Sequence, residues 1–121
     1  NQTGYVGNNV LSGKTPTIQW HELEAAMEQG TLLVDVRTQE ENSAGSIPGS
    51  KLIPIDSLRE NFEQLRGKEV VVTCAVGQRG HTATQLLRSH GISVRNLDGG
   101  YTTWRAGMEA RERAKVASTA L

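Results

Sequence analysis

The chain has 121 residues, enough for one domain with its own apolar core but too few for two. Its 13 basic and 13 acidic residues cancel, and no basic cluster indicates a nucleic acid or an anionic membrane as partner. No apolar run approaches the roughly 20 residues of a membrane span, and no secretory signal pattern is present, so a cytoplasmic protein is expected. The single cysteine excludes an internal disulfide and leaves its thiol either a core residue or a nucleophile.

Composition divides the chain into three parts. Residues 1–16 are rich in Gly, Asn, Ser and Thr and are predicted to be a linker or leader. The domain is expected over residues 17–107. Residues 108–121 are polar and Ala-rich, and form either a docked helix or a frayed tail. Two tryptophans, Trp20 and Trp104, lie on apolar helix faces and are expected in the core.

The first half of the domain predicts two helices around a buried strand. Apolar residues at helical spacing end before Gly30, and the run Leu32–Val36 is typical of a parallel strand covered on both faces. A solvated loop or helix start is expected at Glu40-Glu41, followed by loop with a brief strand near Leu52. Ser57, with Glu60 three residues later, fits a capping box at the start of the second helix.

The second half contains the most clearly predicted strand, Val70–Thr73, which is β-branched throughout and ends at Cys74. A third helix is predicted up to Gly91, then a strand over Ile92–Leu97 and a last helix from about Tyr101. Strands that alternate with helices indicate an α/β fold, a mostly parallel central sheet flanked by helices on both faces. Such sheets bind ligands at the carboxyl ends of their strands.

The segment that follows Cys74 is the candidate site. Because it joins a buried strand to a helix amino end, its backbone N–H groups can converge on an anionic sulfur, and Gly77 and Gly80 permit the backbone angles this requires. The charge of Arg79 and the helix amino end both favour thiolate over thiol. The predicted persulfide-binding loop consists of Ala75, Val76, Gly77, Gln78, Arg79 and Gly80.

A simpler interpretation is that Cys74 only completes a core strand, since free cysteine is among the most buried residue types. Transfer chemistry requires inward-pointing loop amides and a sulfur that reagents can reach. Four residues separate Cys74 from Arg79. Cysteine phosphatases need five, so the shorter ring suits sulfur. His81 is expected to be solvated, and the scattered histidines offer no metal-ligand spacing, so no metal site is predicted.

Three motifs in order resemble the rhodanese homology domain over almost all of residues 17–107. They are Asp35-Val36-Arg37 with Glu41 and Gly45-Ser46-Ile47-Pro48-Gly49, the cysteine loop, and Leu97-Asp98-Gly99-Gly100-Tyr101-Thr102-Thr103-Trp104. The chain departs from the family pattern at Asn42, Ser46 and Ser50. The resemblance implies a rhodanese-like fold, a Cys74 persulfide, and Asp35 and Arg37 as support for the loop. The alternative for Asp35 is that it only ends a strand.

The loop, together with the leader Gly4-Tyr5-Val6-Gly7-Asn8-Asn9-Val10, is also similar to the rhodanese domain that ends flavoproteins of the coenzyme A-disulfide reductase type. This resemblance implies an excised carboxyl-terminal domain whose partner is an amino-terminal flavoprotein disulfide reductase domain. FAD, NAD(P)H and coenzyme A would then bind that partner. The chain itself has no Gly-x-Gly-x-x-Gly after a strand, and no cofactor is expected on it.

The predicted function is sulfur transfer from thiosulfate, polysulfide or a small persulfide to a thiol or cyanide, through a Cys74 persulfide. Its partners are then small sulfur-containing anions and acceptor thiols. Rhodaneses that use thiosulfate commonly have a basic or polar residue where this chain has Ala75, so thiosulfate is expected to be a poor donor. Two alternatives remain: a non-catalytic rhodanese-like interaction module, and a cysteine phosphatase or arsenate reductase.

Overall fold

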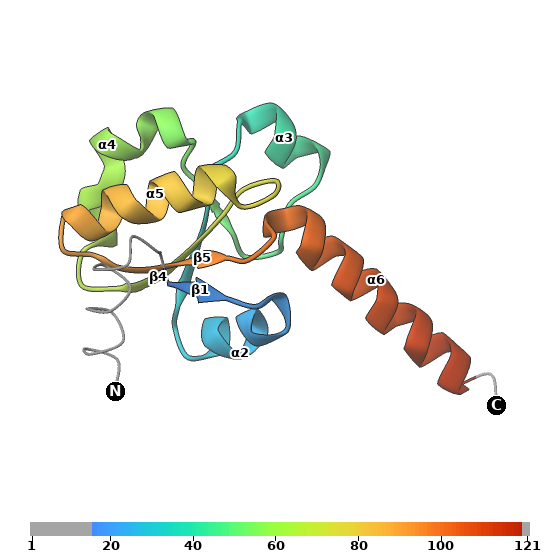
Figure 1. Cartoon of the computed structure of the whole chain (residues 1–121). Helices are drawn as coiled ribbons and strands as arrows, with labels where there is room; N and C mark the ends of the chain where they lie inside the picture. Colours follow the sequence, from blue (N-terminus) through green and yellow to red (C-terminus); the bar gives the residue numbers. More distant parts are fainter. Residues whose placement is uncertain (1–15, 120–121) are drawn as a thin grey trace.

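The computed structural model describes residues 16–119, so all of the predicted leader except Pro16 lies outside the described residues. Five parallel strands form one sheet in the order β1-β5-β4-β2-β3 (Figure 1). Their bounds are β1 Thr17–Ile18, β2 Leu32–Asp35, β3 Lys51–Leu52, β4 Glu69–Thr73 and β5 Ser93–Leu97. The central strand is β4, which therefore delivers the residue that follows it to the middle of the sheet's carboxyl edge.

Helices cover both faces of this sheet. In Figure 1, α4 and α5 lie on one side and α2 on the other, while α6 extends away from the body of the domain. The α-helices are α2 Leu23–Glu28, α3 Gln39–Ala44, α4 Leu58–Asn61, α5 Gln78–Ser89 and α6 Gly100–Thr119. The 3-10 helices are η1 Trp20–Glu22, η2 Ile55–Ser57 and η3 Phe62–Leu65. The predicted fold class is confirmed.

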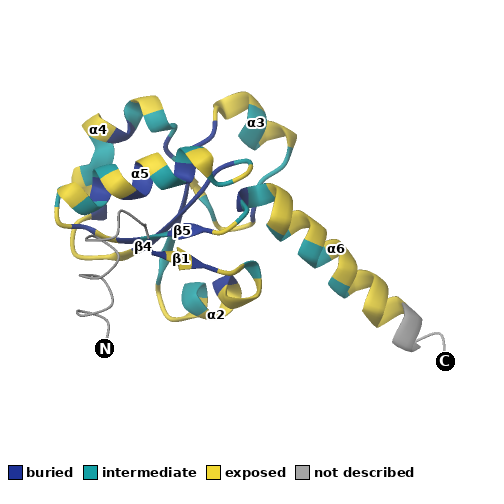
Figure 2. Ribbon diagram, in the orientation of Figure 1, coloured by how far each residue is buried: buried dark blue, intermediate teal, exposed yellow. Residues whose placement is uncertain are grey.

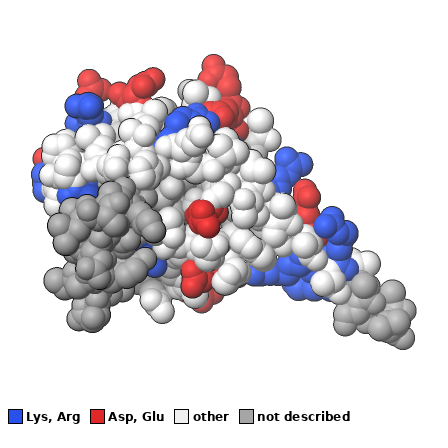
Figure 3. Space-filling view, in the orientation of Figure 1, with Lys and Arg blue, Asp and Glu red and all other residues white. Residues whose placement is uncertain are grey.

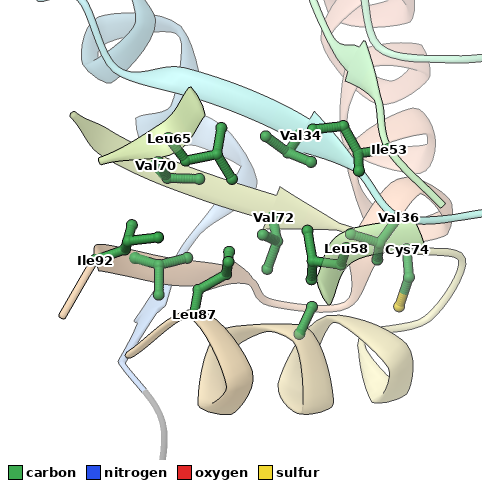
Figure 4. Packing of buried hydrophobic residues seen from close by; sticks show 12 residues of the cluster. Val34, Val36, Ile53, Leu58, Leu65, Val70, Val72, Cys74, Leu87 and Ile92 are labelled. Carbon is green, nitrogen blue, oxygen red and sulfur yellow. The ribbon is translucent and has the colours of Figure 1, made fainter. Parts of the chain in front are cut away.

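The core consists of two apolar layers, because successive side chains of a strand face opposite sides of the sheet. Val70, Val72 and Cys74 face α4 and α5, where they belong to one buried cluster (Figure 4). Val71 faces the other way, into a second cluster with Leu97 of β5. Every residue of β2 and β4 except the first is buried, as expected for parallel strands covered on both faces, and β4 is dark blue in Figure 2.

The capping box predicted at Ser57 is wrong, and a different one forms at Thr38. Ser57 has helical backbone angles (φ −97°, ψ −4°) and its side chain makes no capping bond. Thr38 has extended backbone (φ −73°, ψ 164°). Its side-chain oxygen accepts a hydrogen bond from the Glu41 N–H, and its own N–H donates one to the Glu41 carboxylate. An amino-terminal capping residue needs extended backbone, so of these two residues Thr38 can start a helix this way and Ser57 cannot.

The carboxyl-terminal helix α6 runs without a break from the domain into the predicted tail. Trp20 and Trp104 are only partly buried and line a groove of about 420 Å³ between α2 and α6. Trp104 packs against the second core cluster, so the predicted place in the core is wrong only for Trp20. The reason is geometric: α2 is six residues long and cannot cover the twenty-residue helix beside it. The Trp20 ring packs against Gly107 and under the guanidinium of Arg111, 5.2 Å from the ring centre.

The surface has mixed charge. Figure 3 shows acidic and basic side chains interspersed on one face of the domain, with several basic side chains along the projecting helix. Within residues 16–119, no helix is long and apolar enough to cross a membrane.

Candidate active site

Two backbone N–H groups point at the Cys74 sulfur. The N–H of Gly77 lies 3.0 Å from Sγ and that of Gly80 lies 3.2 Å from it. Gly80 is in the first turn of α5, so the sulfur sits at the positive end of a twelve-residue helix. This convergence agrees with the arrangement expected from the sequence. Two converging N–H donors suit a thiolate or a persulfide anion, because hydrogen bonds stabilise the negatively charged sulfur of either.

The loop also needs its carbonyl groups directed away from the sulfur, and the start of α6 accounts for this. The carbonyl oxygens of Cys74 and Ala75 accept hydrogen bonds from the N–H groups of Tyr101 (2.7 Å) and Thr102 (3.0 Å). Gly100 makes the approach possible, since a Cβ there would overlap the Cys74 carbonyl oxygen. In the sequence this glycine motif is recognisable only as a family signature, because its contact with the cysteine loop joins segments that are distant in the chain.

The sulfur itself is enclosed, because Cys74 is only 1 % exposed. The residue continues the inward-facing side of β4 and packs in the cluster that contains Val36 and Leu58, as Figure 4 shows. The requirement that reagents reach the sulfur is therefore not met in this conformation. The cysteine loop covers the sulfur, since its Gly77 and Gly80 N–H groups contact Sγ. Val76 of this loop is 59 % exposed, so the sulfur lies just beneath a surface segment.

Arg79 does not offer a free cation to the site. Its guanidinium binds the Glu41 carboxylate with two hydrogen bonds, 2.7 and 2.9 Å. The hydrogen bond from Arg79 is the largest cause that lowers the pKa of Glu41, from 4.5 to about 2. A solvated loop or a helix start was expected at Glu40-Glu41, and the helix start is confirmed, because Glu41 lies in the first turn of α3. Glu41 is half-buried and joins that helix to the cysteine loop. The two partners are 38 positions apart in the chain, which explains why no local pattern indicated the pair.

Asp35 and Arg37 form a buried ion pair that supports the site indirectly, through α3. Arg37 Nη2 lies 2.8 Å from Asp35 Oδ2 and also donates to the Gly45 carbonyl. Burial alone raises the pKa of Asp35, but hydrogen bonds from the side chains of Arg37 and Asn42 and from the Arg37 N–H outweigh it and lower that pKa. The pair ties the middle and the carboxyl end of α3 to the sheet. Within the described structure, neither side chain bonds to residues 74–80 directly.

The other predicted loop residues form the outer surface. Ala75 is half-buried, and Val76 and Gln78 are exposed. His81 is half-buried rather than solvated, and its N–H donates to the Gly77 carbonyl at the start of α5. Among residues 16–119, no three His, Cys, Asp or Glu side chains gather closely enough to hold a metal ion.

Comparison with known proteins places this geometry in a family. A family model described as a rhodanese-like domain matches residues 19–107. Human thiosulfate:glutathione sulfurtransferase is 35 % identical over 106 residues, which cover 74 % of this chain and 92 % of the relative.

Two solved structures of longer proteins also match. Reduced CoADR-RHD from Bacillus anthracis has a TM-score of 0.74 and 39 % identity over 86 % of this chain. The NAD-dependent persulfide reductase from A. fulgidus has a TM-score of 0.63 and 33 % identity over 83 % of this chain. This chain spans only 19 % and 18 % of their lengths. The predicted similarity to such rhodanese domains is confirmed, and the chain belongs to the rhodanese-like domain family.

Proposed function

We propose that this chain is a sulfurtransferase that carries a sulfane sulfur atom on Cys74. The observation on which this rests is the pair of N–H groups, from Gly77 and Gly80, directed at Sγ from 3.0 and 3.2 Å. Donors held in place before the reaction stabilise developing negative charge without reorganising, as an oxyanion hole does. The family and the sulfurtransferase among its relatives support the same chemistry.

The reaction has two displacements at sulfur. The Cys74 thiolate attacks the sulfane sulfur of the donor, a new S–S bond forms, and the donor's own bond to that sulfur breaks with the electron pair leaving on the donor remnant. An acceptor thiolate or cyanide then attacks the outer sulfur, and Cys74 leaves as thiolate. Residues 1–121 contain no second cysteine, so an acceptor thiol must come from outside this domain.

The loop surface favours persulfides and polysulfides over thiosulfate. Ala75 and Val76 present apolar groups, and the charge of Arg79 is balanced by Glu41. A compact dianion such as thiosulfate therefore meets no free cation on the loop. A thiol persulfide has a single negative charge, and that charge is on the terminal sulfur, which would accept hydrogen bonds from the loop N–H groups. The preferred acceptor is a small thiol, by analogy with the human relative, whose name includes glutathione.

In its native setting, the domain is proposed to act beside a flavoprotein disulfide reductase domain in the cytoplasm. The similarity to Bacillus anthracis CoADR-RHD supports this arrangement. FAD, NAD(P)H and coenzyme A belong to that partner in this proposal, and the chain itself binds none of them.

Mass spectrometry of the intact protein tests the function. Incubation with polysulfide or glutathione persulfide is expected to add the mass of one sulfur atom, and added thiol or cyanide to remove it. Thiosulfate is expected to load the protein more slowly. The control is Cys74→Ser, which should gain no sulfur. Failure of all three donors to modify the wild-type chain would contradict sulfur transfer.

The burial of Cys74 favours a second candidate, a rhodanese-like module that binds partners without catalysis. A side chain that is 1 % exposed cannot react until the loop moves, and a purely structural cysteine would look the same in this conformation. The inward amides favour transfer, because a neutral thiol in a core needs no hydrogen-bond donors. Accessibility measurements, described in the Discussion, separate the two.

A further inference from the structure

Asn96 is a buried polar residue on the strand next to the cysteine loop. It lies near the carboxyl end of β5, where its backbone pairs with Thr17 of β1 on one side and Val72 of β4 on the other. The residue is 6 % exposed. Its position is therefore set by the sheet, and its side chain starts from one of the most rigid points of the domain.

Among the residues that the structure describes, the Asn96 side chain makes one hydrogen bond, and that bond goes to the loop. Its Nδ2 donates to the Gly77 carbonyl oxygen at 3.0 Å, and the His81 N–H donates to the same oxygen at 3.0 Å. Gly77 has φ 106° and ψ −15°, a left-handed conformation that needs an external constraint to be held in one place. The N–H of this same residue is the donor that lies 3.0 Å from Cys74 Sγ.

The other end of the Asn96 amide is unpaired. Oδ1 is buried and, within the described residues, has no hydrogen-bond partner, which costs free energy. It lies against Gly80, where an added Cβ would overlap it. The side chain thus touches both residues whose N–H groups point at the sulfur, and its hydrogen-bonding benefit comes from Nδ2 alone.

We propose that Asn96 is a positioning residue that holds Gly77 and Gly80 so that their N–H groups meet the anionic sulfur. The inference rests on the proposed function in naming a persulfide as the anion, but it applies equally to the free thiolate. Asn96 acts through the loop backbone and does not contact the sulfur. Its removal should weaken the preference of the site for a charged sulfur without removing the cysteine.

The first test replaces the side chain. Asn96→Ala is expected to raise the pH midpoint of thiolate formation, followed by the thiolate's ultraviolet absorbance against Cys74→Ser. The midpoint should rise by about half a unit to one unit, the equivalent of a threefold to tenfold change for one hydrogen bond. The Cys74 persulfide, loaded with polysulfide, should also give up its outer sulfur about threefold to tenfold more slowly to a fixed concentration of thiol, because the departing Cys74 thiolate loses part of its stabilisation.

The matched control is Val94→Ala. Val94 is buried on the same strand, two residues before Asn96, and belongs to the apolar cluster under α5 without bonding to the loop. This variant removes core packing but should leave both readouts unchanged. An equal change in Val94→Ala, or no change in Asn96→Ala, would overturn the proposal. The titration needs no sulfur donor, so it decides the role of Asn96 even where sulfur transfer fails.

A second variant covers the case in which Asn96→Ala does not fold. Gly80→Ala places a better helix former in α5, and its added Cβ can be accommodated only by moving the Asn96 side chain. It is expected to shift the thiolate midpoint in the same direction. Where the double variant folds, Gly80→Ala should have little further effect in the Asn96→Ala background. A normal midpoint in Gly80→Ala, or an undiminished effect in the double variant, contradicts the assignment.

Discussion

At the scale of single residues, the site differs from its sequence-based description chiefly in how charge is arranged. Arg79 was expected to favour an anionic sulfur directly, but its guanidinium is bound to Glu41 by two hydrogen bonds and acts on Cys74 through its charge alone. The sulfur is instead met by neutral backbone donors from Gly77 and Gly80. Neutral donors stabilise an anion while leaving the thiol form also compatible with the core, which fits the buried setting of Cys74.

The Arg79–Glu41 pair gives a prediction for stability as a function of pH. The folded-state pKa of Glu41 is lowered from 4.5 to about 2, so its contribution is fully present above pH 4.5 and is lost as the pH falls towards 2. Both side chains are 35 % exposed, and solvent screening limits the pair to about 0.2–1 kcal/mol. Glu41→Gln should lower the free energy of unfolding by that amount near neutral pH, with the difference vanishing towards pH 2.

Urea unfolding at several pH values measures this difference. The matched control is Glu40→Gln, which removes the same charge from the same turn of α3 at an exposed position. An equal loss of stability in the two variants would assign the effect to the helix turn in general and not to the contact with Arg79.

At the scale of secondary-structure elements, the short helix α3 depends on the sheet more than on its own sequence. It has six residues, too few for a helix that is stable by itself. The Asp35–Arg37 pair holds it, through Asn42 at its centre and the Gly45 carbonyl at its end. Because α3 in turn supplies Glu41 to Arg79, the pair supports the cysteine loop at a distance.

Asp35→Asn tests this tether. The substitution leaves the Arg37 guanidinium, which is 5 % exposed, without its carboxylate partner. Loss of one partner of a buried pair costs about 3–5 kcal/mol, a large share of the roughly 5–15 kcal/mol that stabilises a domain. Thermal and urea unfolding should show the loss, whereas Asp56→Asn, at an exposed position of η2, should stay close to wild type. A difference below 1 kcal/mol for Asp35→Asn would contradict the tether.

At the scale of the whole molecule, the question is whether Cys74 reacts by local or global opening. The cover over the sulfur is a surface loop and not the core, so we expect iodoacetamide to alkylate Cys74 much faster than the domain unfolds. The alkylation rate should change little with low concentrations of urea, because local opening exposes little surface. Mass spectrometry and unfolding kinetics under the same conditions give the comparison.

A cysteine moved into the core supplies the control for this measurement. Cys74→Ser combined with Val72→Cys places the only thiol on the same face of β4 at a position that is 0 % exposed and not covered by the loop. This thiol should react only through global unfolding. Were Cys74 to react as slowly as that control, with the same urea dependence, the interaction module would be the better description of the protein.

Much of the fold could be predicted from local sequence. A nearly continuous apolar run identified β2 and a β-branched run identified β4, and glycines with positive φ end α2 and α5 at Gly30 and Gly91. The start of the second helix was misplaced, because Ser57 has the composition of a capping residue but lies within helical backbone. A pattern of residue types shows which turn is possible, but the backbone angles depend on what packs around it.

The sequence alone determined the fold class, the position of the nucleophile candidate and the inward-facing amides. All three follow from residues close together in the chain: a β-branched strand, a cysteine at its end, and two glycines before a helix. The tertiary structure alone decided that Arg79 binds Glu41, that the start of α6 takes up the loop carbonyls, and that the sulfur is enclosed. Each of these is a contact between segments distant in the chain, so it depends on how the sheet brings them together.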